Sequence, residues 1–121
     1  MGKVKFVSDS EVAVTAQDID DIICIAFEGG ITYWCYKAEV VGGKYLGQYA
    51  SDQISRGGKL KLYVRDYDEQ EESTFEFDLD DLLFGIEMYV NKHGKFDIDE
   101  CDAEVADAII QYTIFKELIF G

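Results

Sequence analysis

Proline is absent from the 121 residues, histidine occurs once, and no apolar run is long enough to cross a membrane. A transmembrane helix needs about 18 consecutive apolar residues, so a membrane protein is not expected. The opening stretch, MGKVKFVSDSEV, also lacks the apolar core of a signal peptide. The three cysteines, Cys24, Cys35 and Cys101, form no CxxC pair, which is typical of reduced cytosolic thiols. These absences indicate a cytoplasmic protein.

The sequence also lacks the short motifs of common catalytic and nucleotide-binding sites. It contains none of GxxxxGK[ST], GxGxxG, HExxH and GxSxG. His93 stands beside Gly94 at the expected end of a helix, where a partly cationic imidazole suits the helix dipole. A Cys–His dyad has no supporting spacing here. We therefore expect no enzymatic activity and no cofactor.

Positive charge is scarce in the second half of the chain. Up to Arg65 the sequence holds eight acidic and eight basic residues, whereas from Asp66 onward it holds 17 acidic residues and three lysines. The C-terminal half therefore carries the whole net charge of −14. Such a field repels nucleic acid and anionic membranes and attracts basic protein surfaces. The simpler interpretation is that the charge keeps the protein in solution.

The first third of the chain predicts a strand or small hairpin followed by a helix. Residues 3–7 and 11–14 are rich in β-forming side chains around a turn-like Ser-Asp-Ser. Thr15 and Asp18 have the spacing of a capping box, which starts a helix. Apolar or small residues then recur with a helical period over residues 19–35, through two adjacent glycines.

The glycine pair precedes the only tryptophan in the stretch FEGGITYWC. We expect the helix to continue through Gly29 and Gly30, with Trp34 and Cys35 facing the core. Two interior glycines cost a helix about 2 kcal/mol relative to alanine, so close packing at Gly30 must offset them. The alternative is a strand over residues 31–36, because β-branched and aromatic residues favour strands.

The middle of the chain predicts a glycine-rich connection and then a hairpin. Residues 40–58 contain five glycines, and we expect a short helix at about 46–55 within them. Residues 59–78 alternate apolar and polar side chains on both sides of an acidic tip, which predicts a β-hairpin.

Two further helices are expected after the hairpin. The first is capped by Asp78 or Asp80 and stops at Gly94, and the last starts near Asp99 or Asp102. No βαβ unit repeats, so the element order predicts one α+β domain over residues 1–121. In this fold a small antiparallel sheet, made of the N-terminal strand and the 59–78 hairpin, packs against three or four helices.

Three acidic clusters superficially resemble metal sites. They lie within residues 18–21, 78–81 and 97–100, each at an expected helix N-terminus, where acids stabilise the dipole without an ion. An EF-hand loop beginning at Asp97 would need an oxygen ligand and a glycine where Cys101 and Asp102 stand. We therefore expect helix caps and no metal site.

The stretch SRGGK is the most specific-looking loop. Two basic side chains flank a flexible backbone whose N–H groups could cradle a phosphate, and nearby tyrosines could stack on a base. The simpler interpretation is a Gly-Gly turn before a strand. The candidate ligand-binding residues are Arg56, Gly57, Gly58, Lys59, Tyr33, Tyr45 and Tyr49.

Three stretches carry a resemblance: EGGITYWC, YASDQISRGGKLKLY and DAEVADAIIQYTIFKELIFG. Together they resemble a family of small acidic proteins of bacteriophages and other mobile elements of Gram-positive and gut bacteria. The resemblance covers most of the chain, least at the hairpin tip and at residues 78–100, and carries over no catalytic residue. It implies a phage accessory protein, a setting in which small acidic proteins antagonise host defence as nucleic-acid mimics or nucleotide sponges.

We hypothesise a non-enzymatic protein of the host cytoplasm that inhibits a host defence component by occupying its basic nucleic-acid-binding cleft. It would bind neither nucleic acid nor membrane directly, and self-association into a homo-oligomer is a further option. A sponge that sequesters a signalling nucleotide at the SRGG loop and a phage structural or regulatory protein are the alternatives. The candidate protein-binding residues are Asp66, Asp68, Glu69, Glu71, Glu72, Asp97, Asp99, Glu100, Asp102 and Glu104.

Overall fold

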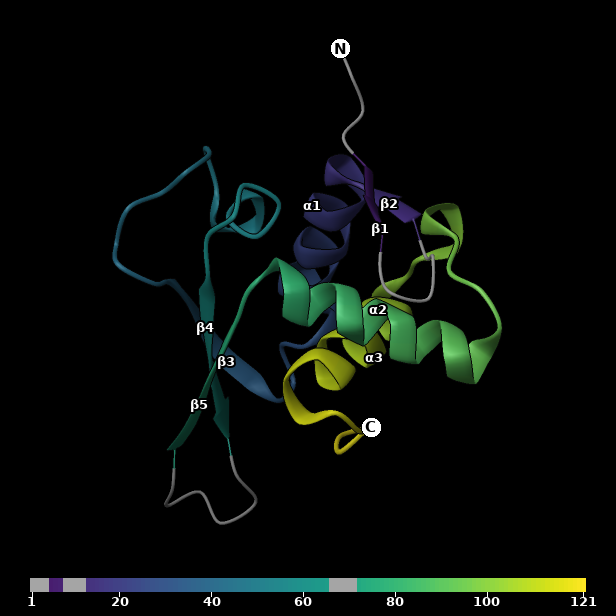
Figure 1. The fold of residues 1–121 in the computed structure, drawn as a ribbon. Helices are drawn as coiled ribbons and strands as arrows, with labels where there is room; N and C mark the ends of the chain where they lie inside the picture. The colour runs from purple at the N-terminus through teal and green to yellow at the C-terminus, as the bar shows by residue number, and fades with distance from the viewer. Residues whose placement is uncertain (1–4, 8–12, 66–71) are drawn as a thin grey trace.

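A computed structural model describes residues 5–7, 13–65 and 72–121, and within them three α-helices and two antiparallel sheets (Figure 1). The predicted α+β class is confirmed. The strands are β1 (Lys5–Val7), β2 (Ala13–Thr15), β3 (Cys35–Val40), β4 (Leu60–Arg65) and β5 (Glu72–Phe77). The helices are α1 (Ala16–Ile25), α2 (Leu79–His93) and α3 (Ala103–Phe115), with a π-turn η1 (Ala26–Gly30) and 3-10 turns η2 (Ala50–Asp52) and η3 (Ile98–Glu100).

Acidic and hydroxyl side chains start the helices, as the sequence predicts. Thr15 and Asp18 form a reciprocal capping box at α1, and Asp78 and Asp81 form another at α2. Asp102 caps α3 by accepting a hydrogen bond from the backbone N–H of Val105 at 2.9 Å. These caps satisfy backbone donors that the first helical turn leaves unpaired. Within the described residues, no group of three metal-ligating side chains is found.

The prediction of a helix that continues through Gly29 and Gly30 to Cys35 is wrong. The helix widens into η1, where the N–H of Ile31 donates to the carbonyl of Ala26, and Gly29 then leaves helical geometry at φ 174° and ψ −20°. Cys35 begins β3, so the alternative of a strand in this region is the better one, although the strand starts four residues later. Trp34 and Cys35 are buried in either conformation, which is why the helical period was misleading.

A close approach at Gly30 is nevertheless present. A Cβ on Gly30 would lie 2.9 Å from the carbonyl oxygen of Ala103, at the start of α3. The absence of a side chain thus allows the backbone of η1 to contact the first turn of α3. This contact places the end of the first helix against the last one.

The three-stranded sheet has the order β3-β4-β5. The predicted 59–78 hairpin is confirmed by the register of β4 and β5, which runs from Leu60 opposite Phe77 to Arg65 opposite Glu72. The third strand is β3, whereas the N-terminal strand β1 pairs only with β2, in a sheet of its own. The expected short helix at 46–55 is reduced to the single turn η2.

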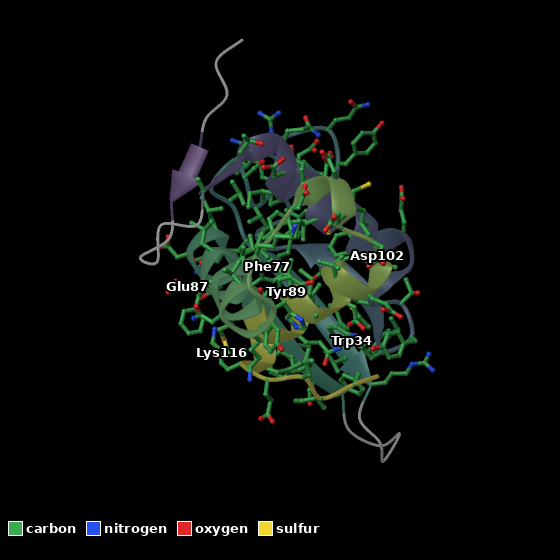
Figure 2. All side chains as sticks on the ribbon, turned by 90° about the vertical axis from the view of Figure 1, so that its right-hand side faces the viewer. Trp34, Phe77, Glu87, Tyr89, Asp102 and Lys116 are labelled. Carbon is green, nitrogen blue, oxygen red and sulfur yellow. The ribbon has the colours of Figure 1, made fainter. Side chains whose placement is uncertain are left out.

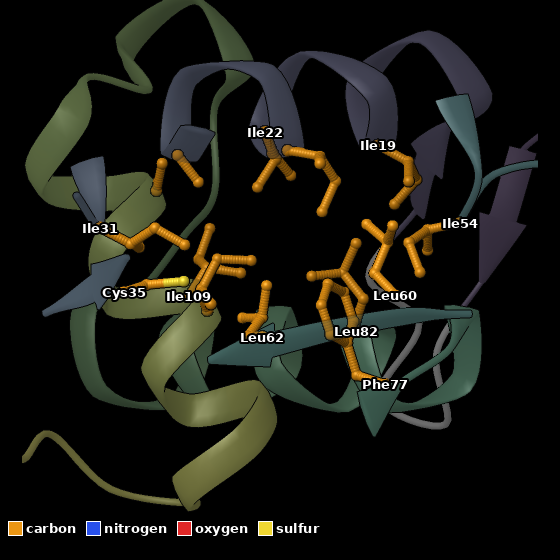
Figure 3. Close-up of a cluster of buried hydrophobic side chains, with 14 of the residues drawn as sticks. Ile19, Ile22, Ile31, Cys35, Ile54, Leu60, Leu62, Phe77, Leu82 and Ile109 are labelled. Atoms are coloured by element: carbon orange, nitrogen blue, oxygen red, sulfur yellow. The ribbon is translucent and has the colours of Figure 1, made fainter. Parts of the chain in front are cut away.

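Helices cover one face of the three-stranded sheet and leave the other open (Figure 1). Leu60, Leu62 and Val64 alternate along β4 toward the helices and are fully buried. Figure 3 shows Ile19 and Ile22 of α1 pointing toward the side chains of β4. The core therefore lies between the inner sheet face and the helices, and it positions the surfaces described next.

Candidate functional site

Two cation-free segments of the chain lie side by side on the helical side of the molecule. Residues 13–36 and 96–115 contain ten acidic residues and no lysine or arginine. The first segment contributes α1 and η1, and the second contributes η3 and α3, with contacts between α1 and both η3 and α3. We call the exposed or half-buried acids Asp21, Glu28, Asp97, Asp99, Glu100, Asp102 and Glu104 the acidic helical surface.

Two thiols lie in these segments, Cys24 in the first and Cys101 in the second. Burial raises the pKa of Cys101 to about 11, and the carboxylates of Asp102 and Asp21 add to that rise. Burial also raises the pKa of Cys24, and the Glu28 carboxylate is the second cause of this rise. The Cys24 thiol donates to that carboxylate at 3.4 Å. The carboxylates of Asp21, in α1, and Asp102, the N-cap of α3, both disfavour the Cys101 thiolate, in agreement with the contacts of α1 with η3 and α3. Neither thiol is activated as a nucleophile, because the thiolate is disfavoured.

The candidate protein-binding acids fall into two groups. Asp97, Asp99, Glu100, Asp102 and Glu104 are exposed around η3 and the first turn of α3. The ends of β4 and β5 that flank the hairpin tip lie at the opposite end of the molecule from η3 (Figure 1). The remaining candidates, Asp66, Asp68, Glu69, Glu71 and the side chain of Glu72, lie outside the described residues.

The SRGG loop uses most of its polar groups internally. Ser55 donates to the carboxylate of Asp20 at 2.5 Å, and Gly58 packs against the side chain of Gln53. Arg56 packs over Gly47 beside Asp52, and its charge also acts on Asp20. Arg56 is exposed, yet it lies among carboxylates, which compete with a phosphate for the guanidinium.

The three tyrosines proposed to act with this loop do not all lie in the same part of the chain. Tyr45 and Tyr49 belong to the same connection as Arg56 and are 55% and 60% exposed. Tyr33 instead precedes β3, where its hydroxyl donates to Asp107 of α3 at 2.5 Å. The structure therefore brings Arg56, Gly57, Gly58, Lys59, Tyr45 and Tyr49 into one connection and places Tyr33 elsewhere.

Tyr33 borders a cavity of about 530 Å³ between η1, α3 and residues 118–121. At its wall, the Asp107 carboxylate accepts hydrogen bonds from the Tyr33 hydroxyl, from Trp34 Nε1 at 2.7 Å and from Gln111 Nε2 at 2.8 Å. Burial and the neighbouring Asp107 raise the pKa of Tyr33 to about 12. The hydroxyl thus remains a donor at neutral pH.

Gln111 connects this carboxylate to the C-terminal segment. Its side chain is 1% exposed, and its amide nitrogen also donates to the carbonyl of Phe120 at 3.2 Å. Its amide oxygen accepts from the N–H groups of Ile119 and Phe120 at 2.8 and 2.9 Å. The ring of Phe120 stacks on Trp34 with centroids 5.4 Å apart. One buried amide thus holds the wall of the cavity in place.

Sequence reasoning missed this network, although a signal for it exists. Asp107 and Gln111 are polar residues four positions apart in the mostly apolar stretch ADAIIQYTIF. Side chains at this spacing share a helix face, and buried polar groups need hydrogen-bond partners. Residues of the stretches EGGITYWC and DAEVADAIIQYTIFKELIFG both line the cavity.

The outer face of the sheet carries a second cluster that was not predicted. The rings of Tyr36 and Tyr63 lie 5.9 Å apart, with Lys37 and Lys61 over Tyr63 and Arg65 over Tyr36. Glu39 accepts from the Tyr63 hydroxyl and pairs with Lys37 at 3.3 Å. These cations therefore have local partners.

His93 lies in the last turn of α2, stacked on Tyr89 with ring centroids 4.3 Å apart.

No helix of the described residues is long and apolar enough to cross a membrane. Comparisons of the chain with protein-family models, with curated proteins and with solved structures found no significant match.

Proposed function

We propose that this protein is a non-enzymatic binding protein that docks its acidic helical surface onto a basic surface of a partner protein. The observation that carries the proposal is the contact of α1 with both η3 and α3, because it brings two distant cation-free segments to one side of the fold. Figure 2 shows Asp102 and Trp34 toward the same side of the molecule, away from Glu87 and Lys116.

Unpaired charge on one side favours recognition of a basic partner. Asp99, Glu100 and Glu104 are exposed, and among the described residues none of them forms a salt bridge, although Lys95 and His93 border a hollow with Asp97 and Glu100. A concentrated field of one sign speeds association with an oppositely charged protein and suppresses wrong partners.

The finer form of the proposal is nucleic-acid mimicry in a phage setting. The resemblance to phage proteins supports a host defence protein in the cytoplasm as the target, and its nucleic-acid-binding cleft as the basic surface. Duplex DNA carries one charge per about 1.7 Å of its axis, so a mimic needs closely spaced carboxylates. The acids between Asp97 and Glu104 supply such a dense group.

The nucleotide-sponge alternative has less support from the geometry. Arg56 lies beside Asp52 and near Asp20, so a phosphate would have to displace these carboxylates or be repelled by them. The cavity beside Tyr33 includes Glu104 and Asp107 in its lining, which also disfavours phosphate.

The test compares two triple variants that remove equal charge. E28Q/D99N/E100Q neutralises exposed acids of the acidic helical surface, and E76Q/D80N/E117Q neutralises exposed acids elsewhere. Each protein is immobilised and exposed to a nuclease-treated bacterial lysate, and bound proteins are eluted first with duplex DNA and then with salt. We expect a DNA-eluted partner on the wild type and on E76Q/D80N/E117Q, and its loss on E28Q/D99N/E100Q. Equal capture by both variants would contradict the proposal, and elution by salt alone would contradict the mimicry.

A further inference from the structure

The cavity beside Tyr33 and Asp107 adjoins the acidic helical surface, because Glu104 belongs to both. It is lined by η1 at Gly29 and Gly30, by the first turns of α3, and by Leu118 and Phe120. At about 530 Å³ it is large enough for a side chain of a partner protein. Its lining contains two carboxylates and no lysine or arginine among the described residues.

The walls of the cavity are fixed before any ligand arrives. Gln111 makes two donor and two acceptor contacts through one amide, which holds residues 119–120 against α3. Trp34 and Tyr33 hold Asp107 from the side of β3. Within the described residues, no buried side-chain nitrogen or oxygen lacks a hydrogen-bond partner. A preformed wall lowers the ordering cost of binding.

The chemistry of the lining selects a planar cation. Tyr33 is 55% exposed and offers a ring face, and Glu104 is exposed at the same cavity. Three hydrogen bonds occupy Asp107, two at Oδ1 and one at Oδ2, and a carboxylate has about four acceptor positions. An arginine side chain can stack on an aromatic ring and donate to a carboxylate at once, which a lysine ammonium does less well.

We infer that this cavity receives an arginine side chain of the partner, with the guanidinium beside the Tyr33 ring and the Glu104 and Asp107 carboxylates. The inference rests on the proposed function and specifies how the acidic helical surface recognises its partner protein. Long-range attraction by the exposed acids brings the basic surface close, and the cavity then fixes one residue of it.

Trp34 provides a direct probe, because it is the only tryptophan and its indole N–H donates to Asp107. N-acetyl-arginine amide is titrated into the protein while the single indole resonance is followed by NMR. N-acetyl-citrulline amide, which has nearly the same shape but no charge, is the matched ligand. We expect the arginine compound to shift the resonance with a Kd of about 1 mM, as befits so small a ligand, and the citrulline compound to leave it in place.

Variants assign the shift to the cavity. E104Q should weaken binding of the arginine compound about threefold, and Y33L should weaken it by a similar factor through loss of the ring. E100Q removes a nearby exposed acid outside the cavity and should change the Kd little, and Y33F keeps the ring and should bind nearly as the wild type does. Equal shifts with citrulline, no shift with arginine, or a Kd insensitive to E104Q would each overturn the inference.

The two proposals fail in different ways. If the arginine compound does not bind but E28Q/D99N/E100Q still loses its DNA-eluted partner, the acidic helical surface acts without the cavity. If the arginine compound binds as expected and both triple variants capture the same proteins, the cavity is real and the proposed docking surface is wrong.

Discussion

On the outer face of the sheet, Lys37 pairs with Glu39, and Lys37, Lys61 and Arg65 lie over tyrosine rings. On the acidic helical surface, the carboxylates meet backbone N–H groups at caps, a neutral side chain or solvent, and no cation belongs to the same segments. Both regions are charged, but the sheet cations lie against a carboxylate or tyrosine rings, whereas the acids of the acidic helical surface form no salt bridge among the described residues and share only a hollow with Lys95 and His93. The excess of negative charge therefore lies on the helical side of the molecule. Some of the acids there cap helices and others do not.

The largest expected effect is the loss of stability when Asp107 is replaced, compared with replacement of an exposed acid. Asp107→Ala removes the acceptor of three hydrogen bonds and leaves the buried indole N–H of Trp34 without its partner, so the free energy of unfolding should fall by about 3 kcal/mol. Asp99→Ala removes an exposed acid and should change it by less than about 0.5 kcal/mol. Urea unfolding measures both, and equal losses would contradict the structural role of Asp107.

The next effect tests the contact that holds η1 against α3. Gly30→Leu places side-chain atoms where the Ala103 carbonyl lies and should lower the free energy of unfolding by about 2 kcal/mol through overpacking. Gly29→Ala is the control, because a Cβ there meets nothing within 4 Å. If the Gly30→Leu protein unfolds at the same urea concentration as the control, the close approach is not a constraint.

A smaller effect distinguishes acids that cap a helix from acids in the first turn of the same helix that do not. Asp102→Ala on the helical side and Asp78→Ala beside the sheet should each cost about 1 kcal/mol, because each loses a helix cap. Glu104→Gln and Asp80→Asn, in the first turns of the same helices, make no cap and should cost much less. Thermal unfolding of the four variants provides the measurement. Equal costs in both pairs would show that the caps are replaceable.

The smallest effect is a pH dependence at Tyr33. Its pKa is about 12 in the folded protein and about 10 in an unfolded chain. The raised value means that its contribution to stability is fully present below pH 10 and is lost as the pH rises toward 12. Tyr33 is more than half exposed, so solvent reduces the effect. Tyr33→Phe should lack this part of the alkaline decline, and urea unfolding from pH 9 to 12 compares the two proteins; identical pH profiles would contradict it.

Local signals in the sequence predicted the helix starts and the hairpin. Thr15, Asp78 and Asp102 each accept from the backbone N–H three residues later, so their role can be read from spacing alone. Gly94 ends α2 at φ 94°, a conformation that glycine adopts readily. The β4–β5 pairing needs only a short connection and an alternating pattern.

Long-range pairing explains what could not be predicted. Residues 31–35 satisfy both a helical period and a strand propensity, and β3 is selected by pairing with β4, whose partner residues lie 20 to 29 positions later in the chain. For the candidate site, the density of acids predicted a charged surface, but its location depends on α1 meeting η3. The cavity depends on Trp34, Asp107 and Phe120, which no local pattern connects.

The hydrogen bond from Trp34 to Asp107 joins residues 73 positions apart, which has a consequence for the order of folding during synthesis. Helix α1 and the β4–β5 hairpin need only neighbouring residues and can form while the chain is still growing. The indole cannot reach its acceptor, contact Phe115 or stack on Phe120 until α3 and the segment after it have left the ribosome. Burial of Trp34 therefore depends on the synthesis of α3 and of residues 116–120, and its fluorescence reports when these residues pack against it.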